Sequence, residues 1–418
     1  MNYNLQPMEQ PIIDPVSLDK IKAELTPAKK LRDTNKSRNE IYVVNHHDSP
    51  NIMMEIGRLR EEAFRDSGGG SGLSMDIDEF DTMETPYQQL IVWDPDAEKI
   101  LGGYRYILGT DIRLDDNGQP LLATSHMFRF SEKFIKEYLP YTIELGRSFV
   151  SPEYQSSKAG TKALFALDNL WDGLGALAIV HPNMKYFFGK MTMYPEYNRE
   201  ARDLIQHFLF KHFEDKEKLV VPMDPLVIET PAERMDAILT ETDFREDYKL
   251  LNAEVRRLGV NIPPLVNSYM SLSPTMKMFG GGINHEFSEA EETCIMISFD
   301  EIYDAKKARH IDSFIKEKVT LLRRRFPVFA EDMGENLTEM VAKKRELVQA
   351  RIEERRRRRM EKRAAREVRK KTRRHQDGRG SRNRKWKRIQ DIKMYMKRIF
   401  RGRFSRWLQV SVCLTESF

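Results

Sequence analysis

Apolar and polar residues follow two patterns along the chain, one typical of strands and one typical of helices. Residues 141–150 place β-branched and aromatic residues between polar ones, which predicts a strand that ends at Ser151-Pro152. After Gly160, residues 161–178 carry apolar side chains at helical spacing. A strand, a turn of small residues and a helix in this order expose free N–H groups at the positive end of the helix dipole. The pattern therefore predicts an anion-binding turn where this helix begins.

The predicted strand contains an irregularity. Strict alternation would place Glu144 and Arg147 on opposite faces of the sheet. Gly146 lies between them, and a glycine inside a strand often marks a bulge. One extra residue there would bring both charged side chains to the same face and separate the strand from its neighbour. The alternative is a regular strand in an ordinary α/β domain.

Further elements follow from the same patterns. Helical spacing is found in residues 51–66, 198–213, 244–258 and 311–326, and strands are predicted at 41–44, 90–93, 100–108, 185–189 and 294–299. Residues 67–74 are rich in Gly and Ser, which predicts a flexible segment, either a mobile lid or a plain loop.

Length and composition allow one large domain with extensions at both ends. The chain has 418 residues, of which 40% are hydrophobic. Its two cysteines, Cys294 and Cys413, are far apart, so we expect no disulfide framework and no cysteine-based metal site, in keeping with a reducing cytoplasm. We expect a loosely held polar arm at 1–40, a folded domain at 41–330 and a basic helical tail at 331–418. No signal-peptide pattern and no membrane-spanning apolar run is expected from the sequence.

The net charge of +5 hides an uneven distribution. Residues 341–418 carry 29 Lys and Arg against 8 Asp and Glu, a balance of +21, which leaves −16 for the rest of the chain. The two parts are expected to have different partners. Residues 384–408 place apolar side chains on one helical stripe with Lys and Arg opposite, which is typical of a helix on an anionic membrane surface. Nucleic-acid binding and docking of an acidic protein are the alternatives.

Four short motifs occur in order ahead of the tail. They are Leu59-Arg60-x-x-x-Phe64, Asp78-Glu79-Phe80-Asp81, Gly102-x-x-Arg105 and Glu144-x-x-Arg147. Together they resemble the acyl-carrier-protein-dependent N-acyltransferases, which include the acyl-homoserine-lactone synthases and the ornithine-lipid or hemolysin-like amino-acid N-acyltransferases. The resemblance covers roughly residues 40–305, and later segments, including Asn284-x-Glu286-Phe287, are similar to the lipid branch.

The resemblance implies a fold and an activity. The implied fold is α/β (α+β), a GNAT-like mixed sheet with a splayed, bulged central strand flanked by helices. The implied enzyme moves a (3-hydroxy) fatty acyl group from acyl-carrier protein to the α-amine of glycine or ornithine, which makes a lyso-aminolipid. No bound cofactor or metal is expected, and the enzyme is expected in the cytoplasm at the inner face of the membrane. A lactone-type synthase using S-adenosylmethionine, or a GNAT-like scaffold that binds RNA through the tail, are the alternatives.

Two departures from the family pattern bear on the donor. A Trp found in many lactone synthases is replaced by the Gly/Ser segment. The loop Gln155-x-x-Lys158-x-Gly160 resembles the GNAT pattern Arg/Gln-x-x-Gly-x-Gly/Ala, with Lys158 in place of the first Gly. Acyl-CoA brings a pyrophosphate, whereas acyl-carrier protein brings one phosphodiester. Fewer N–H donors are then needed, and Lys158 adds a point charge.

N-acylation assigns roles to individual residues. An amine is largely protonated at neutral pH, so a base must remove a proton. By resemblance Glu144 is that base, with a salt-bridged strand carboxylate as the alternative. A bulge leaves N–H groups unpaired, and those of Phe149 or Val150 are expected to bind the oxyanion. Tyr194 or Tyr197 could protonate the leaving thiolate, although either could be an ordinary core or surface tyrosine.

Arginine pairs bidentately with carboxylates, which makes Arg105 and Arg147 candidates for the carboxylate of the amino acid. The resemblance also implies that these two form an electrostatic cluster with acidic residues, and that Arg60 and Phe64 order the N-terminal half over the acyl chain. A solvated helix face is the alternative for Arg60. The expected substrate-binding set is Arg60, Phe64, Asp78, Asp81 and Arg105, the catalytic set is Glu144, Arg147 and Tyr194, and the acyl- and pantetheine-binding set is Phe149, Val150, Gln155, Lys158 and Gly160.

Overall fold

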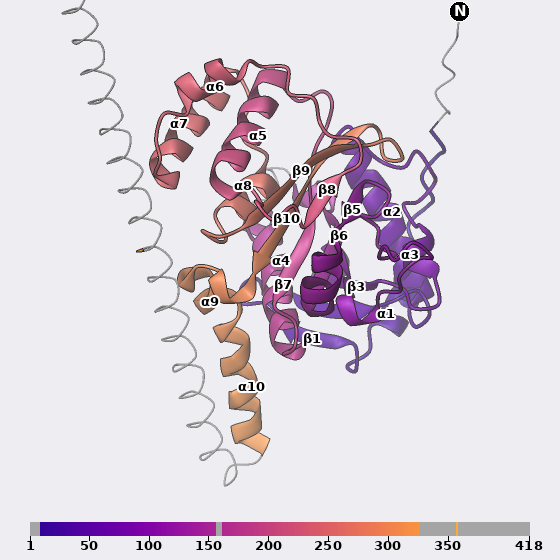
Figure 1. Cartoon of the computed structure of the whole chain (residues 1–418). Coiled ribbons are helices and arrows are strands. Elements are labelled where there is room, and N and C mark those ends of the chain that lie inside the picture. Colours follow the sequence, from indigo (N-terminus) through magenta and orange to yellow (C-terminus); the bar gives the residue numbers. More distant parts are fainter. Residues whose placement is uncertain (1–8, 156–160, 326–356, 358–418) are drawn as a thin grey trace, which may run out of the picture. The chain divides into compact units, whose positions relative to one another are not determined.

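A computed structural model describes residues 9–155 and 161–325, together with Arg357 (Figure 1). Within these residues the strands form an eight-stranded sheet in the order β1-β2-β3-β4-β6-β7-β10-β9 and a two-stranded sheet of β5 and β8. All pairs are antiparallel except β6 with β7. The strands are β1 (Lys30–Asp33), β2 (Glu40–Val44), β3 (Gln88–Asp94), β4 (Lys99–Leu108), β5 (Phe128–Phe130), β6 (Thr142–Val150), β7 (Tyr186–Met193), β8 (Val220–Pro222), β9 (Lys277–Asn284) and β10 (Ala290–Ser298).

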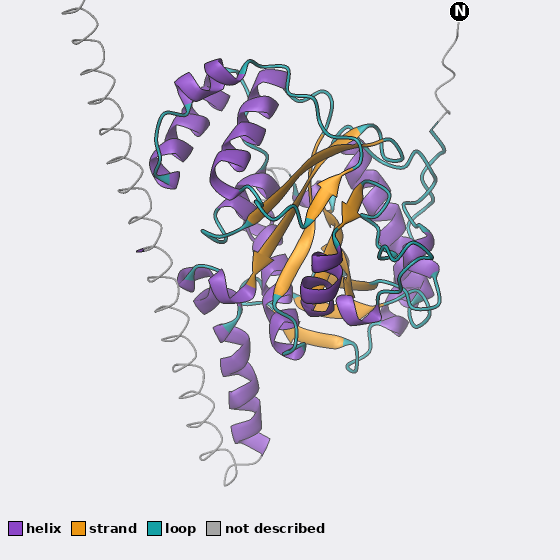
Figure 2. Cartoon of the chain, viewed as in Figure 1, coloured by secondary structure: helices purple, strands orange, loops and turns teal. Residues whose placement is uncertain are grey.

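Helices cover both faces of the large sheet (Figure 2). The helices are α1 (Leu18–Glu24), α2 (Pro50–Asp66), α3 (Glu79–Thr82), α4 (Thr161–Val180), α5 (Arg199–Phe213), α6 (Ala232–Ile238), α7 (Phe244–Arg257), α8 (Pro264–Met270), α9 (Asp304–His310) and α10 (Asp312–Arg325). Single turns lie at Gly109–Asp111, Phe134–Tyr138, Leu139–Tyr141, Pro152–Tyr154 and Phe299–Glu301. The expected mixed α/β fold with a large sheet flanked by helices is confirmed.

The apolar stripes of the helices explain the layers. The stripe of α2, with Ile52 and Ile56, packs on β2, β3 and β4 in one core cluster. Leu170 and Leu174 of α4 pack on the opposite face against Leu90 and its neighbours. Helices α5 to α8 bury their apolar sides on the same face, over β7, β9 and β10. Each helix therefore lies where its hydrophobic face removes a strip of the sheet from water.

The N-terminal segment differs from the loosely held arm that the sequence predicts. Residues 9–40 contain α1 and β1, and β1 forms an edge strand paired with β2. The carboxylate of Glu24 accepts the backbone N–H groups of Asn51 (3.1 Å) and Ile52 (2.8 Å) at the start of α2. Free N–H groups at a helix start need such partners, so α1 is attached to α2 by a contact that composition does not reveal.

The Gly/Ser segment is also held in place. The buried carboxylate of Glu61 accepts the N–H of Ser71 (2.9 Å), its hydroxyl (2.7 Å) and the N–H of Gly72 (2.8 Å). Ser288 donates its hydroxyl to the carbonyl of Gly70 at 2.9 Å. Gly68, Gly70 and Gly72 all have positive φ, a conformation that glycine adopts without strain. The segment is therefore a shaped loop rather than a free one.

Strand β6 carries the predicted irregularity. Gly103 of β4 pairs with Phe149 and Arg105 pairs with Gly146, so β6 has one more residue than β4 across this interval. Arg147, in the bulge, has a φ of 46°. The parallel ladder with β7 runs only from Thr142–Tyr186 to Leu145–Gly189, although β6 continues to Val150. The bulged, splayed central strand is thus confirmed.

The chain divides into two compact units, residues 1–338 and 339–418. The boundary that the sequence predicts at residue 330 and the basic segment 384–408 lie outside the described residues. Among the helices in the described residues, none combines the length and the apolar character needed to cross a membrane.

Candidate functional site

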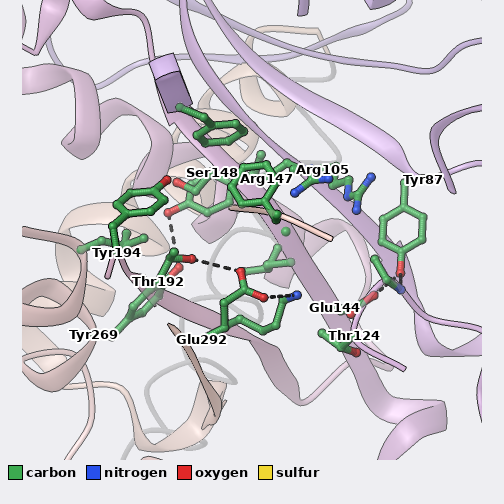
Figure 3. A pocket seen from close by; sticks show the side chains of 18 residues that line it. Tyr87, Arg105, Thr124, Glu144, Arg147, Ser148, Thr192, Tyr194, Tyr269 and Glu292 are labelled. Atoms are coloured by element: carbon green, nitrogen blue, oxygen red, sulfur yellow. Dashed lines mark hydrogen bonds and ion pairs between the residues drawn. The ribbon is translucent and has the colours of Figure 1, made fainter. Parts of the chain in front are cut away.

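A pocket with a cavity volume of about 80 Å³, partly open to solvent, lies where β6 diverges from β7 (Figure 3). Strands β4, β6, β7 and β10 contribute most of its lining, and α2, α8 and four loops complete it. The lining comprises Phe64, Tyr87, Tyr104, Arg105, Ala123, Thr124, Glu144, Leu145, Gly146, Arg147, Ser148, Lys190, Thr192, Tyr194, Leu265, Tyr269, Phe287 and Glu292.

The pocket reaches both faces of the sheet. Tyr104 and Tyr269 belong to the core on the side of α4 and α8, and their hydroxyls are 3.5 Å apart. Glu144 alternates with Leu145 and therefore lies on the opposite face. A regular ladder between β6 and β7 would close this passage. The splay therefore leaves an opening between β6 and β7 that is lined by side chains from both faces of the sheet.

Glu144 is the buried carboxylate of this opening. Its side chain is 2% exposed and accepts the hydroxyl of Tyr87, which in turn accepts the N–H of Ala123 at 3.0 Å. Burial raises the pKa of Glu144 above its usual value, although the bond from Tyr87 and the charges of Arg105 and Lys190 oppose the rise. A carboxylate with a raised pKa at the end of a cavity is suited to accept a proton from a nearby amine.

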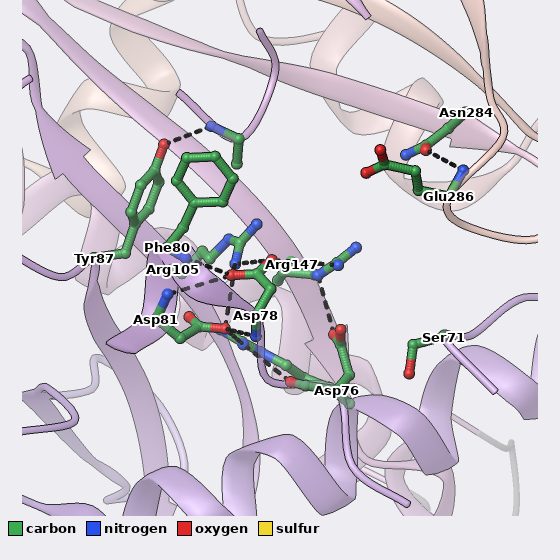
Figure 4. Close-up of polar contacts among 12 residues, drawn as sticks. Ser71, Asp76, Asp78, Phe80, Asp81, Tyr87, Arg105, Arg147, Asn284 and Glu286 are labelled. Carbon is green, nitrogen blue, oxygen red and sulfur yellow. Dashed lines mark hydrogen bonds and ion pairs between the residues drawn. The ribbon is translucent and has the colours of Figure 1, made fainter. Parts of the chain in front are cut away.

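The expected cluster of arginines and aspartates is present (Figure 4). Asp78 caps α3 and accepts Nη1 of Arg105 on both oxygens at 2.7 Å. Asp81 accepts Nη1 of Arg105 (3.2 Å) and Nη1 of Arg60 (3.0 Å). Arg60 is 0% exposed, so the alternative of a solvated helix face is wrong. This network attaches α2 and α3 to β4 and thereby positions Arg105 at the pocket.

Arg147 projects from the bulge onto the same face as Glu144. Its Nε lies 3.0 Å from Asp76 and its Nη2 lies 3.5 Å from Asp78. Its guanidinium lies over the ring of Phe287, 4.6 Å from the centroid, and Phe64 packs edge-on against the same ring. Two carboxylates and an aromatic face therefore already contact Arg147, and Phe64 and Phe287 add aromatic surface to this otherwise polar side of the opening.

The splayed half of β6 carries the candidate oxyanion donors. Ser151 donates its N–H to Leu101 of β4 at 2.9 Å. Because N–H directions alternate along a strand, the N–H of Phe149 also points to β4, whereas that of Val150 points toward the gap left by β7. The geometry favours Val150 over Phe149 as a donor. The side chain of Phe149 packs in the core beneath α2.

The turn after β6 is described in part. Gln155 is exposed and donates its side-chain amide to the carbonyl of Val150 at 2.7 Å. Lys158 and Gly160 lie outside the described residues, so the predicted anion-binding turn stays a prediction.

Of the two candidate tyrosines, Tyr194 lines the pocket and Tyr197 does not. Tyr197 donates its hydroxyl to the carbonyl of Asn261 at 2.9 Å. Burial raises the pKa of Tyr194 to about 12, so its hydroxyl stays protonated at neutral pH and can donate a proton or a hydrogen bond. Gly69 of the shaped loop packs directly against its ring, where a Cβ would lie 2.3 Å from a ring carbon.

Eight polar residues of the pocket are absent from the sequence-based set: Tyr87, Tyr104, Thr124, Ser148, Lys190, Thr192, Tyr269 and Glu292. Lys190 pairs with Glu292 at 2.5 Å, and Glu292 also accepts Thr192 (3.2 Å) and Asn284 (3.1 Å). Burial alone would raise the pKa of Glu292, but Lys190 more than offsets it and the pKa is lowered. Continuing the alternation of strand 185–189 by one residue would have placed Lys190 on the face of Phe188, but pairing with β6 was needed to locate it beside Glu144.

Within the part of the chain that the structure describes, no group of three or more His, Cys, Asp or Glu side chains is placed to hold a metal ion.

Comparisons with known proteins agree with this geometry. Residues 59–164 match the family described as an acetyltransferase (GNAT) domain. A protein of Bacteroides thetaiotaomicron named glycine N(alpha)-acyltransferase is 64% identical over 312 residues, covering 75% of this chain and 93% of that protein. A protein of Phocaeicola vulgatus with the same name is 63% identical over 306 residues, covering 73% of this chain and 94% of that protein.

A solved CoA-dependent acyl-homoserine lactone synthase, with SAM and isopentyl-CoA, aligns at 10% identity and a TM-score of 0.28. The alignment covers 67% of this chain and 89% of that one. The two bacterial relatives are matched over nearly their whole length. In the pocket, the buried carboxylate of Glu144 lies on β6, the strand that diverges from β7. The chain is an acyltransferase and belongs to the glycine N(alpha)-acyltransferase family.

Proposed function

We propose that this protein transfers a long-chain acyl group from the thioester of an acyl-carrier protein to the α-amine of glycine, forming an N-acylglycine. The observation that carries the proposal is the position of Glu144, buried at the opening where β6 leaves β7. The names of the two relatives support glycine rather than ornithine as the acceptor. An N-acyl amino acid with a (3-hydroxy) acyl chain is the lyso form of an aminolipid.

The proposed reaction forms one bond and breaks one. Glu144, directly or through a water, takes one proton from the ammonium of glycine. The free amine then attacks the thioester carbon and gives its second proton to water. The oxyanion of the tetrahedral intermediate accepts the N–H of Val150, which points into the gap beside β7. Collapse breaks the C–S bond, and the thiolate takes a proton from Tyr194 or from water. A thiol has a reference pKa of roughly 8.5, so this last step needs little help.

The proposed donor rests on the loop after β6. A carrier-borne pantetheine brings one phosphodiester, which suits a loop where Lys158 replaces a glycine that would cradle a pyrophosphate. The acyl chain is then expected on the face of Tyr104, Leu265 and Tyr269, because the polar groups occupy the other face.

The test is an acylation assay with the purified full-length chain. Acyl-carrier protein and coenzyme A, each carrying the same acyl group, are offered with glycine, ornithine, serine or S-adenosylmethionine, and products are identified by mass spectrometry. We expect N-acylglycine from the carrier protein, and a fall in kcat of about 10²-fold or more for Glu144→Gln. Glu55→Gln, on the far part of α2, is the matched control and should retain activity. Absence of any N-acyl product, or unchanged activity in Glu144→Gln, would refute the proposal.

A further inference from the structure

The pocket has a hollow beside Gly146 that no side chain fills. The cations Arg105 and Lys190 and the carboxylate of Glu144 surround it. Gly146 is paired with Arg105 of β4. On the other side, the ladder with β7 ends at Leu145–Gly189, so Lys190 would be the next partner of Gly146 if the ladder continued. Glu144 lies two residues before Gly146, on the same face as Phe188 and Lys190. All four residues line the same pocket.

Because Gly146 has no side chain, the space next to its Cα is unfilled. A Cβ placed there would meet Nε of Arg105 at 3.4 Å and its Cγ at 3.6 Å, and no other described residue beyond its chain neighbours within 4 Å. Any larger side chain would extend over the guanidinium and into the gap toward β7. The hollow therefore exists because this position of the central strand is a glycine.

Arg105 directs an unused donor into this hollow. Its Nη1 is occupied by Asp78 and Asp81, which fixes the plane of the guanidinium. Arg105 is only 3% exposed, so water has little access to its Nε. This buried Nε has no hydrogen-bond partner among the described residues. A buried donor without a partner costs free energy unless a ligand satisfies it. The rest of the guanidinium is held in a constant orientation by α3.

Lys190 supplies the second cation. Its ammonium has three N–H donors, and the contacts found for it are Glu292 at 2.5 Å and the sulfur of Met127 at 3.5 Å, a weak acceptor. The oxygens of Glu292 are turned toward Lys190, Asn284 and Thr192. The pair therefore leaves the ammonium able to donate toward the pocket while Glu292 holds it at the end of the gap.

We propose that the hollow at Gly146 binds the carboxylate of the acceptor amino acid between Arg105 and Lys190. The proposal rests on the proposed function and adds the position of the acceptor to it. With the carboxylate in this hollow, the amine of an α-amino acid is only two bonds away from the carboxylate carbon and lies on the face of Glu144. In Arg147, the other candidate, Nε itself lies 3.0 Å from Asp76, and the guanidinium also contacts Asp78 and Phe287. In Arg105 the carboxylates are bound at Nη1, and Nε has no partner among the described residues. The acceptor is thus selected as a zwitterion, with opposite charges at its two ends.

The test compares glycine with glycinamide, which has the same amine but no carboxylate. Gly146→Ala fills the hollow, and its Cβ would make only ordinary contacts, so the fold should tolerate it. Lys190→Met combined with Glu292→Gln removes the ammonium without leaving a buried charge unpaired. For both variants we expect the KM for glycine to rise about 10-fold or more while kcat/KM for glycinamide changes much less. The preference for glycine over glycinamide should therefore fall by the same factor.

Lys277→Met combined with Asp215→Asn is the matched control, since Lys277 lies in β9, is partly buried and pairs with the buried Asp215 but does not line the pocket. It should keep the preference of the wild type. If the wild type acylates glycine but neither pocket variant changes the preference, the carboxylate site is refuted while the proposed function stands. If the wild type acylates no amino acid, the proposed function itself fails.

Discussion

Burial and neighbouring charges shift the pKa of the Glu144 carboxyl group in opposite directions. Burial raises its pKa, while the hydroxyl of Tyr87 and the positive charges of Arg105 and Lys190 stabilise the ionised form and lower it. A base must be ionised before the reaction and must bind a proton during it. The environment of Glu144 keeps the pKa above that of an exposed glutamate without leaving the charge unsupported, which suits the proposed role.

The hydroxyl of Tyr87 gives a test at this scale. Tyr87→Phe removes a hydrogen bond to the ionised form, so the pKa of Glu144 should rise further. A bond to a charged group is worth about 1.5–3 kcal/mol, and one pKa unit corresponds to about 1.4 kcal/mol. We expect the acidic limb of the pH profile of kcat/KM to move upward by about one to two pH units. Activity on the acid side falls, and raising the pH restores much of it.

Tyr106→Phe is the matched control, because Tyr106 is a buried tyrosine of β4 that does not line the pocket. Its acidic limb should coincide with that of the wild type. If Tyr87→Phe lowers activity equally at every pH, Tyr87 supports the fold and not the ionisation of Glu144.

At the scale of elements, α2, α3 and β4 are joined by charges rather than by apolar contact alone. Asp81 accepts both Arg60 and Arg105 and completes the capping box of α3. Burial alone would raise the pKa of Asp81, but the two guanidinium groups more than offset it, so its pKa lies well below the usual value. The same network holds Arg105 at the pocket, so the stability of these elements and the geometry of the site depend on one carboxylate.

Asp81→Asn should therefore destabilise the protein strongly. Removing one member of a buried ion pair leaves the other charge uncompensated and costs about 3–5 kcal/mol, which urea unfolding at neutral pH would measure. A carboxylate with a lowered pKa stabilises the fold above its unfolded pKa of about 3.9 and loses this effect as the pH falls. The difference between wild type and variant should shrink below about pH 4.

The exposed pair of Glu84 with Arg113 is the control, and Glu84→Gln should leave the unfolding midpoint unchanged. If Asp81→Asn unfolds at the same urea concentration as the wild type, the network does not support the fold.

In the whole molecule, the net charge changes from negative to positive near residue 340 of the sequence. The boundary between the two compact units, at residues 338 and 339, falls at nearly the same position in the sequence. The relatives match 93% and 94% of their own lengths but only 75% and 73% of this chain, so this chain is longer than either. The basic residues 341–418 follow a domain with a net negative charge. We propose that this part attaches the enzyme to an anionic membrane, where an acylated product would enter the lipid phase, while nucleic acid remains the weaker candidate partner.

Vesicle flotation tests this proposal. The full-length chain should float with vesicles containing anionic lipid, bind neutral vesicles much less, and lose binding as salt increases, because each basic residue near the surface adds on the order of 1 kcal/mol. A chain ending at Thr338, the limit of the first compact unit, should not float and should still acylate a soluble acceptor. Equal flotation of both chains, or release of the full-length chain by RNA, would contradict a membrane role for the tail.

Much of the structure of β6 could be predicted from the sequence. The periodicity of 141–150, the glycine at position 146 and the spacing of Glu144 and Arg147 predicted a bulge that the register with β4 confirms. These are properties of one short segment, where side-chain period and backbone freedom act locally. The order of the four motifs predicted the fold and the acyltransferase class, which the relatives confirm.

Other features of the site and the fold were decided only by the tertiary structure, because they depend on contacts between segments far apart in the sequence. The capping of α2 by Glu24, the anchoring of the Gly/Ser loop by Glu61 and the bond from Tyr87 to Glu144 join residues that no local pattern relates. Lys190 became part of the site because β7 lies beside β6 and then diverges from it. Local propensity sets the elements, but burial, ion pairing and the hollow at Gly146 arise from which elements become neighbours, and that is settled by packing of the whole domain.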